Sequence, residues 1–112
     1  MGFKLGPASN KLGTDFNTYW IVPSIPYDDV TITGTPTITE VTTSDLVIDN
    51  VAVETSAISH GGRSVAANRS VRCTIAPKLN VTGRRRLRLN YVTSDSLSRE
   101  TLEGEIMIKE AV

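Results

Sequence analysis

The sequence has few of the residues that build metal sites and disulfides. Its 112 residues include one cysteine, one histidine, one tryptophan and no glutamine. A single cysteine cannot form an internal disulfide, which excludes a disulfide-stabilised miniprotein. One cysteine and one histidine also fall short of the roughly four nitrogen or sulfur ligands of a structural zinc site. We therefore expect neither a bound metal nor another cofactor.

Long apolar runs are also missing. The longest run covers residues 19–22, far below the roughly 20 residues that a membrane-spanning helix needs. Residues 1–20 do not show the charged and then apolar order of a secretory signal. We therefore expect a soluble protein that is made in the cytoplasm of its host and has no membrane partner. A chain of this length is expected to form one domain with a modest core.

β-Branched residues dominate the composition, with 14 Thr, 11 Val and 9 Ile. Such residues fit the pleated, half-buried surface of a sheet. Apolar and polar residues alternate in several segments, as they do in half-buried strands. These segments are residues 30–39, 46–49, 51–54, 70–75 and 86–91. The pattern predicts an all-β protein, built as an antiparallel sheet or a sandwich.

Turn-forming residues separate the alternating segments. They occur at residues 33–36, 43–45, 60–62, 77 and 82–83. Strands at intervals of roughly 8–12 residues, with short turns between them, are typical of a meander, a sandwich or an open sheet.

Residues 1–29 differ from the rest of the chain. They contain five of the six aromatic residues and several glycines and prolines, and they show no periodicity. A disordered tail is usually poor in aromatics, so we expect this segment to be held in place. We predict an extended N-terminal arm over residues 1–29 and a β-domain over residues 30–112, with Tyr19, Trp20 and Tyr27 in contact with a neighbouring subunit. The alternative is an irregular cap over the core of the same chain.

The C-terminal segment allows two structures. Residues 102–108 alternate in polarity, which favours a final strand. The alternative is a C-terminal helix through residues 99–103, with Ser96 or Ser98 as its N-cap and acidic residues near its start. Gly104 would cost such a helix about 1 kcal/mol relative to alanine, so we favour the strand.

Charge is distributed unevenly, although the net charge is zero. Residues 1–60 contain seven acidic and two basic side chains, whereas residues 61–112 contain five acidic and ten basic ones. Eight basic residues and no acidic residue lie between Arg63 and Arg88. This basic stretch is the strongest functional signal in the sequence.

The basic stretch predicts a face that binds phosphate. If its two strands pair, Arg72 and Thr74 lie beside Arg86, Arg88 and Asn90 on one polar face. Arginine offers bidentate hydrogen bonds to phosphate, and threonine and asparagine add neutral ones. These five residues are therefore the predicted nucleic-acid-binding residues.

Two other interpretations of the charge pattern remain open. Acidic and basic strands often pair with each other within one sheet. Acidic and basic surfaces also meet between subunits. Zero net charge weighs against a dedicated nucleic-acid-binding protein, which is usually basic.

Few residues are suited to catalysis, and we expect that the protein is not an enzyme. His60 is the only histidine and lies at a predicted Gly-Gly turn, so a catalytic triad would have to use an exposed loop residue. Cys73 falls on the apolar face of its strand, as expected of a buried, unreactive thiol. Asp28 and Asp29 lack the spacing of a calcium-binding loop.

Residues 72–75, which are followed by Pro77, and residues 86–91 are predicted to form two basic strands, and residues 93–95 come before the possible C-terminal helix. This order resembles the small coat proteins of single-stranded RNA phages. The resemblance covers residues 68–110. It implies that an Arg-, Thr- and Asn-rich sheet face meets RNA inside a shell.

The N-terminal segment resembles a different group of virion proteins. Decoration, or cement, proteins on the heads of tailed phages often join a small β-domain to an extended arm. Residues 1–29 are similar to such an arm and do not resemble the N-terminal hairpin of the RNA-phage coat proteins.

Together these features lead us to expect a non-enzymatic structural protein of a phage virion. Its expected partners are copies of itself or a major capsid protein, and nucleic acid at the basic face. One alternative is a decoration protein that docks on a tailed-phage head. Another is a carbohydrate- or receptor-binding β-module, which would need exposed aromatics on the β-domain, where only Tyr91 is present and faces the predicted core.

Overall fold

The computed structural model describes residues 3–5, 8–9, 17–25, 29–78, 81–95 and 102–109. All regular secondary structure in these ranges is β-strand, which confirms the predicted all-β class. The strands are β1 (Phe3–Lys4), β2 (Ala8–Ser9), β3 (Asn17–Ile21), β4 (Ile32–Val41), β5 (Leu46–Val53), β6 (Ile58–His60), β7 (Arg63–Val65), β8 (Val71–Pro77), β9 (Gly83–Thr93) and β10 (Leu102–Lys109). Over the same residues, no helix is long and apolar enough to cross a membrane.

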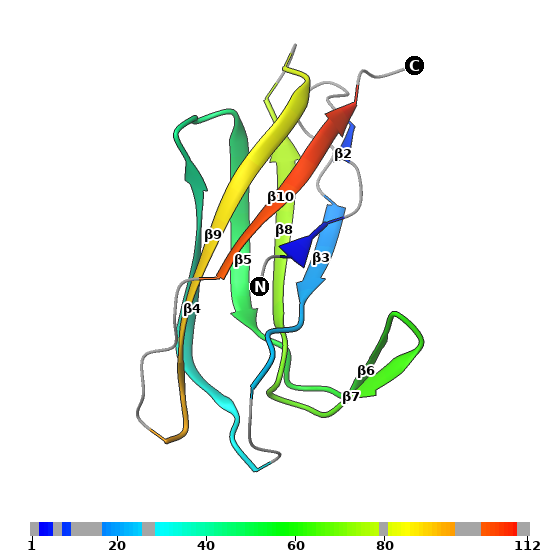
Figure 1. The fold of residues 1–112 in the computed structure, drawn as a ribbon, viewed down its shortest axis with the longest axis vertical. Helices are drawn as coiled ribbons and strands as arrows, with labels where there is room; N and C mark the ends of the chain where they lie inside the picture. The colour runs from blue at the N-terminus through cyan, green and yellow to red at the C-terminus, as the bar shows by residue number, and fades with distance from the viewer. Residues whose placement is uncertain are drawn as a thin grey trace.

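Two sheets face each other as the layers of a sandwich (Figure 1). Sheet A has the order β1-β10-β9-β4, with β2 also paired to β10, and sheet B has the order β3-β8-β5. Paired strands are antiparallel, except that the short strands β1 and β2 run parallel to β10. Strands β6 and β7 form a separate hairpin that projects from one end of the sandwich (Figure 1).

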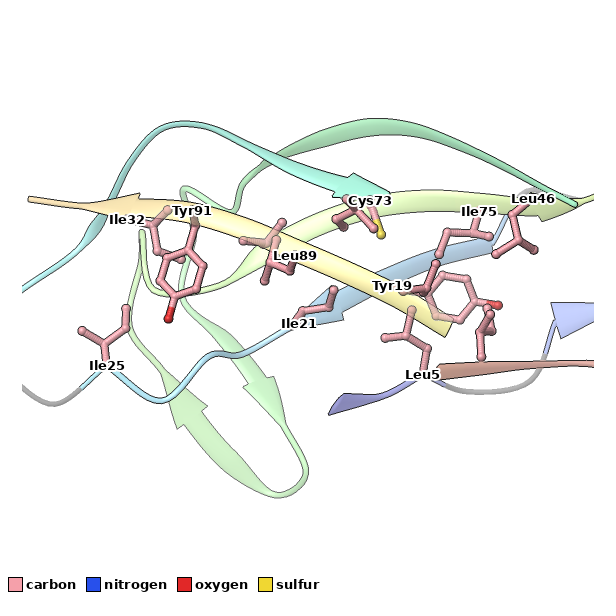
Figure 2. Close-up of a cluster of buried hydrophobic side chains, with 14 of the residues drawn as sticks. Leu5, Tyr19, Ile21, Ile25, Ile32, Leu46, Cys73, Ile75, Leu89 and Tyr91 are labelled. Carbon is pink, nitrogen blue, oxygen red and sulfur yellow. The ribbon is translucent and has the colours of Figure 1, made fainter. Parts of the chain in front are cut away.

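The core lies between the two sheets and consists mostly of aliphatic side chains (Figure 2). Alternation along each strand points Cys73 and Ile75 of β8 toward Leu87 and Leu89 of β9, and all four are fully buried. The same cluster includes Leu5, Tyr19, Ile21, Ile25, Val30, Ile32, Ile38, Leu46, Val71, Tyr91, Ile106 and Ile108. The pattern that predicted the strands is therefore the pattern that builds the core.

The described part of residues 1–29 belongs to the sandwich. Strand β3 pairs with β8 and buries Tyr19 and Ile21 in the core. Nearer the N-terminus, Leu5 is buried, and its backbone N–H donates to the carbonyl of Glu105 at 3.0 Å. Packing of these apolar side chains against the core of their own chain removes their surface from water, which is favourable. Over these residues the segment is therefore held by its own domain.

Strand β4 runs through the turn predicted at residues 33–36. Its ladder with β9 shifts register between Thr33 and Thr37, so the extra residues form a bulge within one strand. Gly34 has a φ of 68°, which suits glycine, and Pro36 is tolerated because β4 is an edge strand of sheet A. The turn prediction was wrong here, because on an edge strand glycine and proline also mark bulges.

Strand β5 contains a second bulge. Its ladder with β8 shifts register between Asp49 and Ala52. Asn50 lies within the bulge with a φ of 55°, a conformation that asparagine tolerates. The bulge shifts the inward-facing positions from even to odd numbers, which explains the two separate alternating patterns in residues 46–49 and 51–54.

The chain passes from sheet A to sheet B through a corner between β4 and β5, at the turn predicted for residues 43–45. The Glu40 carboxylate accepts hydrogen bonds from the backbone N–H groups of Asp45 at 2.9 Å and Leu46 at 2.8 Å. Arg85, near the start of β9, donates to the Asp45 carboxylate at 2.9 Å. The corner is therefore tied to both sheets.

The C-terminal segment forms the favoured strand. Strand β10 pairs with β9 over seven positions, and Ile106 and Ile108 are buried in the core. The alternative helix is excluded at Leu102 and Glu103, which lie in this strand, whereas residues 96–101 lie outside the described residues. Burial of two isoleucines by alternation favours the strand over a helix interrupted by glycine.

Candidate functional site

The outer face of sheet B contains a shallow hollow of about 490 Å³. Its lining consists of Thr18 and Trp20 from β3, Asn50 from β5, and Arg72 and Thr74 from β8. We call these five residues the Trp20 face. The structure thus brings together three of the residues that the sequence singled out, namely Trp20, Arg72 and Thr74.

Strand register explains why these side chains meet. In the ladder between β3 and β8, Trp20 lies opposite Arg72 and Thr18 lies opposite Thr74. Residues at alternate positions point to the same side of a sheet, so all four side chains point outward. Asn50 joins them from the bulge of β5, where its Nδ2 donates to Thr74 Oγ1 at 3.1 Å.

Glu54, just after β5, fixes the indole of Trp20. Glu54 Oε1 accepts a hydrogen bond from Trp20 Nε1 at 2.9 Å and lies 3.7 Å from Arg72 Nη1. Glu54 Oε2 accepts from the backbone N–H of Ser56 at 3.3 Å, and only 7% of Glu54 is exposed. The bond from Trp20, and then that from Ser56, hold the pKa of Glu54 below its ordinary value. Glu54 is therefore ionised at neutral pH and keeps the indole in one orientation.

The five predicted nucleic-acid-binding residues do not form one face. Strand β8 belongs to sheet B and β9 to sheet A, so these two strands do not pair. Arg72 and Thr74 point outward from sheet B, whereas Arg86, Arg88 and Asn90 point outward from sheet A on the opposite side of the sandwich. The prediction of a single basic patch was wrong, because consecutive strands of a sandwich can lie in different sheets.

Acidic side chains of β10 balance the arginines of β9. Arg86 Nη2 lies 2.7 Å from Glu103 Oε2, and Arg88 Nη2 lies 3.0 Å from Glu103 Oε1. Arg84 Nε lies 3.5 Å from Glu105 Oε2. Hydrogen bonds from Arg88 and Arg86 hold the pKa of Glu103 below its ordinary value. On sheet A the charge pattern therefore follows the interpretation of pairing within the chain.

We predict that the contacts of Glu54 stabilise the fold at neutral pH and are lost in acid. Because folding lowers the pKa of Glu54, its contribution is complete above the ordinary value of 4.5 and disappears as the pH falls through the lowered pKa. Glu54→Gln removes this titration. Denaturant unfolding should therefore show that E54Q loses less stability than the wild type between about pH 5 and pH 3.

Glu103→Gln is the matched control for this measurement. The pKa of Glu103 is lowered too, but its arginine partners are exposed and solvent screens the pairs. E103Q should therefore follow the wild-type pH profile more closely than E54Q does. Parallel profiles for the wild type and E54Q would contradict the role assigned to Glu54.

The other predicted contact residues are Tyr19 and Tyr27. Tyr19 points into the core, where Figure 2 shows its ring among the buried side chains, and it is 8% exposed. Burial raises the pKa of its phenol. The prediction of Tyr19 as an anchor for a neighbouring subunit was therefore wrong, because alternation along β3 points it inward. Tyr27 lies outside the described residues.

The residues considered for catalysis lie apart from each other. Cys73 is fully buried, and burial raises the pKa of its thiol to about 11, so the thiol stays protonated. His60 is exposed at the end of the β6–β7 hairpin. Within the described ranges, no group of three or more His, Cys, Asp and Glu side chains is close enough to hold a metal ion.

Sequence reasoning missed Asn50 and Glu54. Glu54 lies 34 positions from Trp20, and Asn50 lies 24 positions from Thr74. Both contacts depend on the strand order of sheet B and on the bulge in β5, which no local motif specifies. The only signal was the change in phase of the apolar alternation between residues 46–49 and 51–54.

The Trp20 face therefore combines a fixed aromatic side chain, a guanidinium and neutral hydrogen-bonding groups on an open sheet surface. Such a surface suits contact with another macromolecule better than chemistry on a small enclosed substrate. Comparison of the chain with protein-family models, curated proteins and solved structures yields no significant match.

Proposed function

We propose that the protein is a non-enzymatic structural protein of a phage-like virion, which works by contact with copies of itself or with a major capsid protein. The observation that supports this proposal is the Trp20 face. Tryptophan and arginine are enriched among the residues that dominate the binding energy of protein interfaces. Here Trp20 and Arg72 are direct neighbours on an open sheet, and Glu54 already holds the indole in place. Little ordering is therefore needed when a partner binds.

Of the two virion roles, docking on a capsid fits the charges better than enclosing RNA. A coat protein that meets RNA through sheet A needs an excess of positive charge on its outer face. Glu103 and Glu105 balance most of the charge of Arg84, Arg86 and Arg88 there. We therefore favour the decoration role, with the RNA-packaging coat as the alternative.

Light scattering coupled to size exclusion tests the proposal, with absorbance recorded for both protein and nucleic acid. A megadalton particle that contains nucleic acid would support the coat role. A small oligomer free of nucleic acid would support the decoration role. A monomer at every concentration would contradict assembly with copies of itself.

The single tryptophan makes the contact face directly observable. If the Trp20 face lies in the contact, emission should shift to shorter wavelength as mass increases with concentration. Thr18→Glu places a charge on this face and should abolish both changes. Thr39→Glu is the matched control, because Thr39 is exposed on β4 in the other sheet. Assembly that survives T18E unchanged would contradict the assignment of this face.

The second candidate function is a carbohydrate-binding module. The sequence left this hypothesis without an exposed aromatic on the β-domain, but the structure places Trp20 on its surface beside Asn50, Arg72 and Thr74. An aromatic ring flanked by hydrogen-bonding side chains is suited to bind a sugar ring. A saturable change in tryptophan emission on titration of a monomer with oligosaccharides would favour this function over assembly.

A further inference from the structure

A cleft of about 610 Å³ lies between the β6–β7 hairpin and the segment that follows β3. Residues 22–24 line one side of it. His60, residues 63–66 and Arg69 line the rest. The cleft shares no lining residue with the Trp20 face. It is therefore a second, separate surface feature.

The lining contains basic side chains and no aspartate or glutamate. Five arginines elsewhere in the described ranges form ion pairs with carboxylates of the chain. Arg69 donates to the backbone carbonyls of Val30 and Ile25. Among the described residues, neither a carboxylate nor a backbone carbonyl pairs with the guanidinium of Arg63. The guanidinium of Arg63 is thus available to an anion from outside the chain.

The hairpin presents Arg63 together with His60. The two residues are opposite each other in the β6–β7 ladder and flank the turn of Gly61 and Gly62. Both glycines have positive φ, 59° and 77°, as a type I′ hairpin turn requires. Residues 59–64 are exposed and add nothing to the core. The turn therefore fixes two hydrogen-bond donors at one end of the cleft.

The remaining lining is largely apolar and selects among anions. Val22, Pro23, Val65 and Ala66 lie beside the basic side chains. A free phosphate ion would leave these apolar walls uncovered. A nucleic-acid strand would lack the stacking platform of large aromatic side chains, because none of the nine lining residues is tryptophan, tyrosine or phenylalanine. The lining is best matched by a carboxylate between apolar side chains.

We propose that this cleft binds an acidic peptide segment of a partner protein. A carboxylate of the segment accepts hydrogen bonds from Arg63 and His60, and its flanking apolar side chains contact Val22 and Val65. This inference rests on the proposed function, in which the protein binds other proteins. It states which kind of partner segment the second contact surface binds.

NMR titration of the full chain, labelled with nitrogen-15, tests the inference. The probe is a blocked five-residue peptide of alternating valine and aspartate, and the control probe has asparagine at each aspartate position. The acidic probe should shift the amide signals of Val22, Ser24 and residues 59–66 and leave those of the Trp20 face in place. Arg63→Gln should weaken its binding about tenfold, the loss expected for one charge-assisted hydrogen bond.

Arg84→Gln is the matched control variant, because Arg84 is an exposed arginine on sheet A, away from the cleft. R84Q should bind the acidic probe as the wild type does. Dispersed amide signals in each variant show that it is folded. Equal binding of the asparagine probe, equal weakening by both variants, or no shift at the cleft would overturn the inference.

Two further titrations separate the competing anions. Inorganic phosphate and a single-stranded oligonucleotide should each bind the cleft more weakly than the acidic probe. Tighter binding of either one would overturn the peptide assignment. Failure here is distinguishable from failure of the proposed function, because light scattering and tryptophan emission report assembly through the Trp20 face independently of the cleft.

Discussion

Replacing Tyr19 with alanine is expected to destabilise the fold by roughly 3 kcal/mol, as truncation of a large buried aromatic side chain usually does. The ring lies in the core between the two sheets, and only 8% of Tyr19 is exposed (Figure 2). Its removal leaves a cavity that the β-sandwich cannot fill without moving β3. Urea unfolding followed by circular dichroism measures this loss.

Two variants show that the loss comes from the core. Tyr19→Phe retains the ring and should cost about 1 kcal/mol or less. Thr18→Ala is the matched control on the same strand, because Thr18 is exposed on the opposite face of β3 and should change stability by about 0.5 kcal/mol at most. If Y19A kept wild-type stability and reduced only the assembled mass, Tyr19 would be a subunit contact and its core assignment would be wrong.

The placement of Tyr19 shows where local sequence patterns reach their limit. The alternation of buried Tyr19 and Ile21 around Trp20 is too short to stand out among the glycines and prolines of residues 1–29. Longer patterns such as residues 86–91 were sufficient to predict strands. The three-residue pattern of residues 19–21 does not predict a strand by itself. The strand is defined by its ladder with β8, which is remote in sequence.

Strand order was the other property that the sequence did not specify. The alternation correctly predicted that Arg72 and Arg86 each point away from a core, but a period of two does not say which strands are neighbours. Which strands are neighbours depends on how the apolar faces of all the strands pack against each other. Here it separates the two arginines onto opposite sides of the sandwich and joins Trp20 to Arg72 instead.

Replacing Arg69 with alanine is expected to destabilise the fold by roughly 2 kcal/mol, because the guanidinium donates two hydrogen bonds from a charged group to the backbone. One bond goes to the carbonyl of Val30, and the other goes to that of Ile25 at 3.2 Å. Both of these residues are buried and belong to the core cluster. Loss of the guanidinium removes both of these hydrogen bonds and loosens the segment that leads to the cleft.

Two further variants separate the geometry of Arg69 from its charge. Arg69→Lys keeps the charge but cannot span both carbonyls with a planar fork, so it should recover only part of the stability. Arg63→Ala removes a neighbouring exposed arginine without such bonds and should unfold within about 0.5 kcal/mol of the wild type. Equal unfolding midpoints for R69A and the wild type would contradict the bracing role.

The same variants connect stability to the cleft, because Arg69 also lines it. If Arg69 acts by positioning residues 22–24, R69K should weaken the binding of the acidic peptide although the charge is retained. It should also speed amide hydrogen exchange in the segment it braces. R63Q should weaken binding with no change in exchange there. The two arginines of the cleft would then have different tasks, with Arg63 contacting the ligand and Arg69 holding the wall in place.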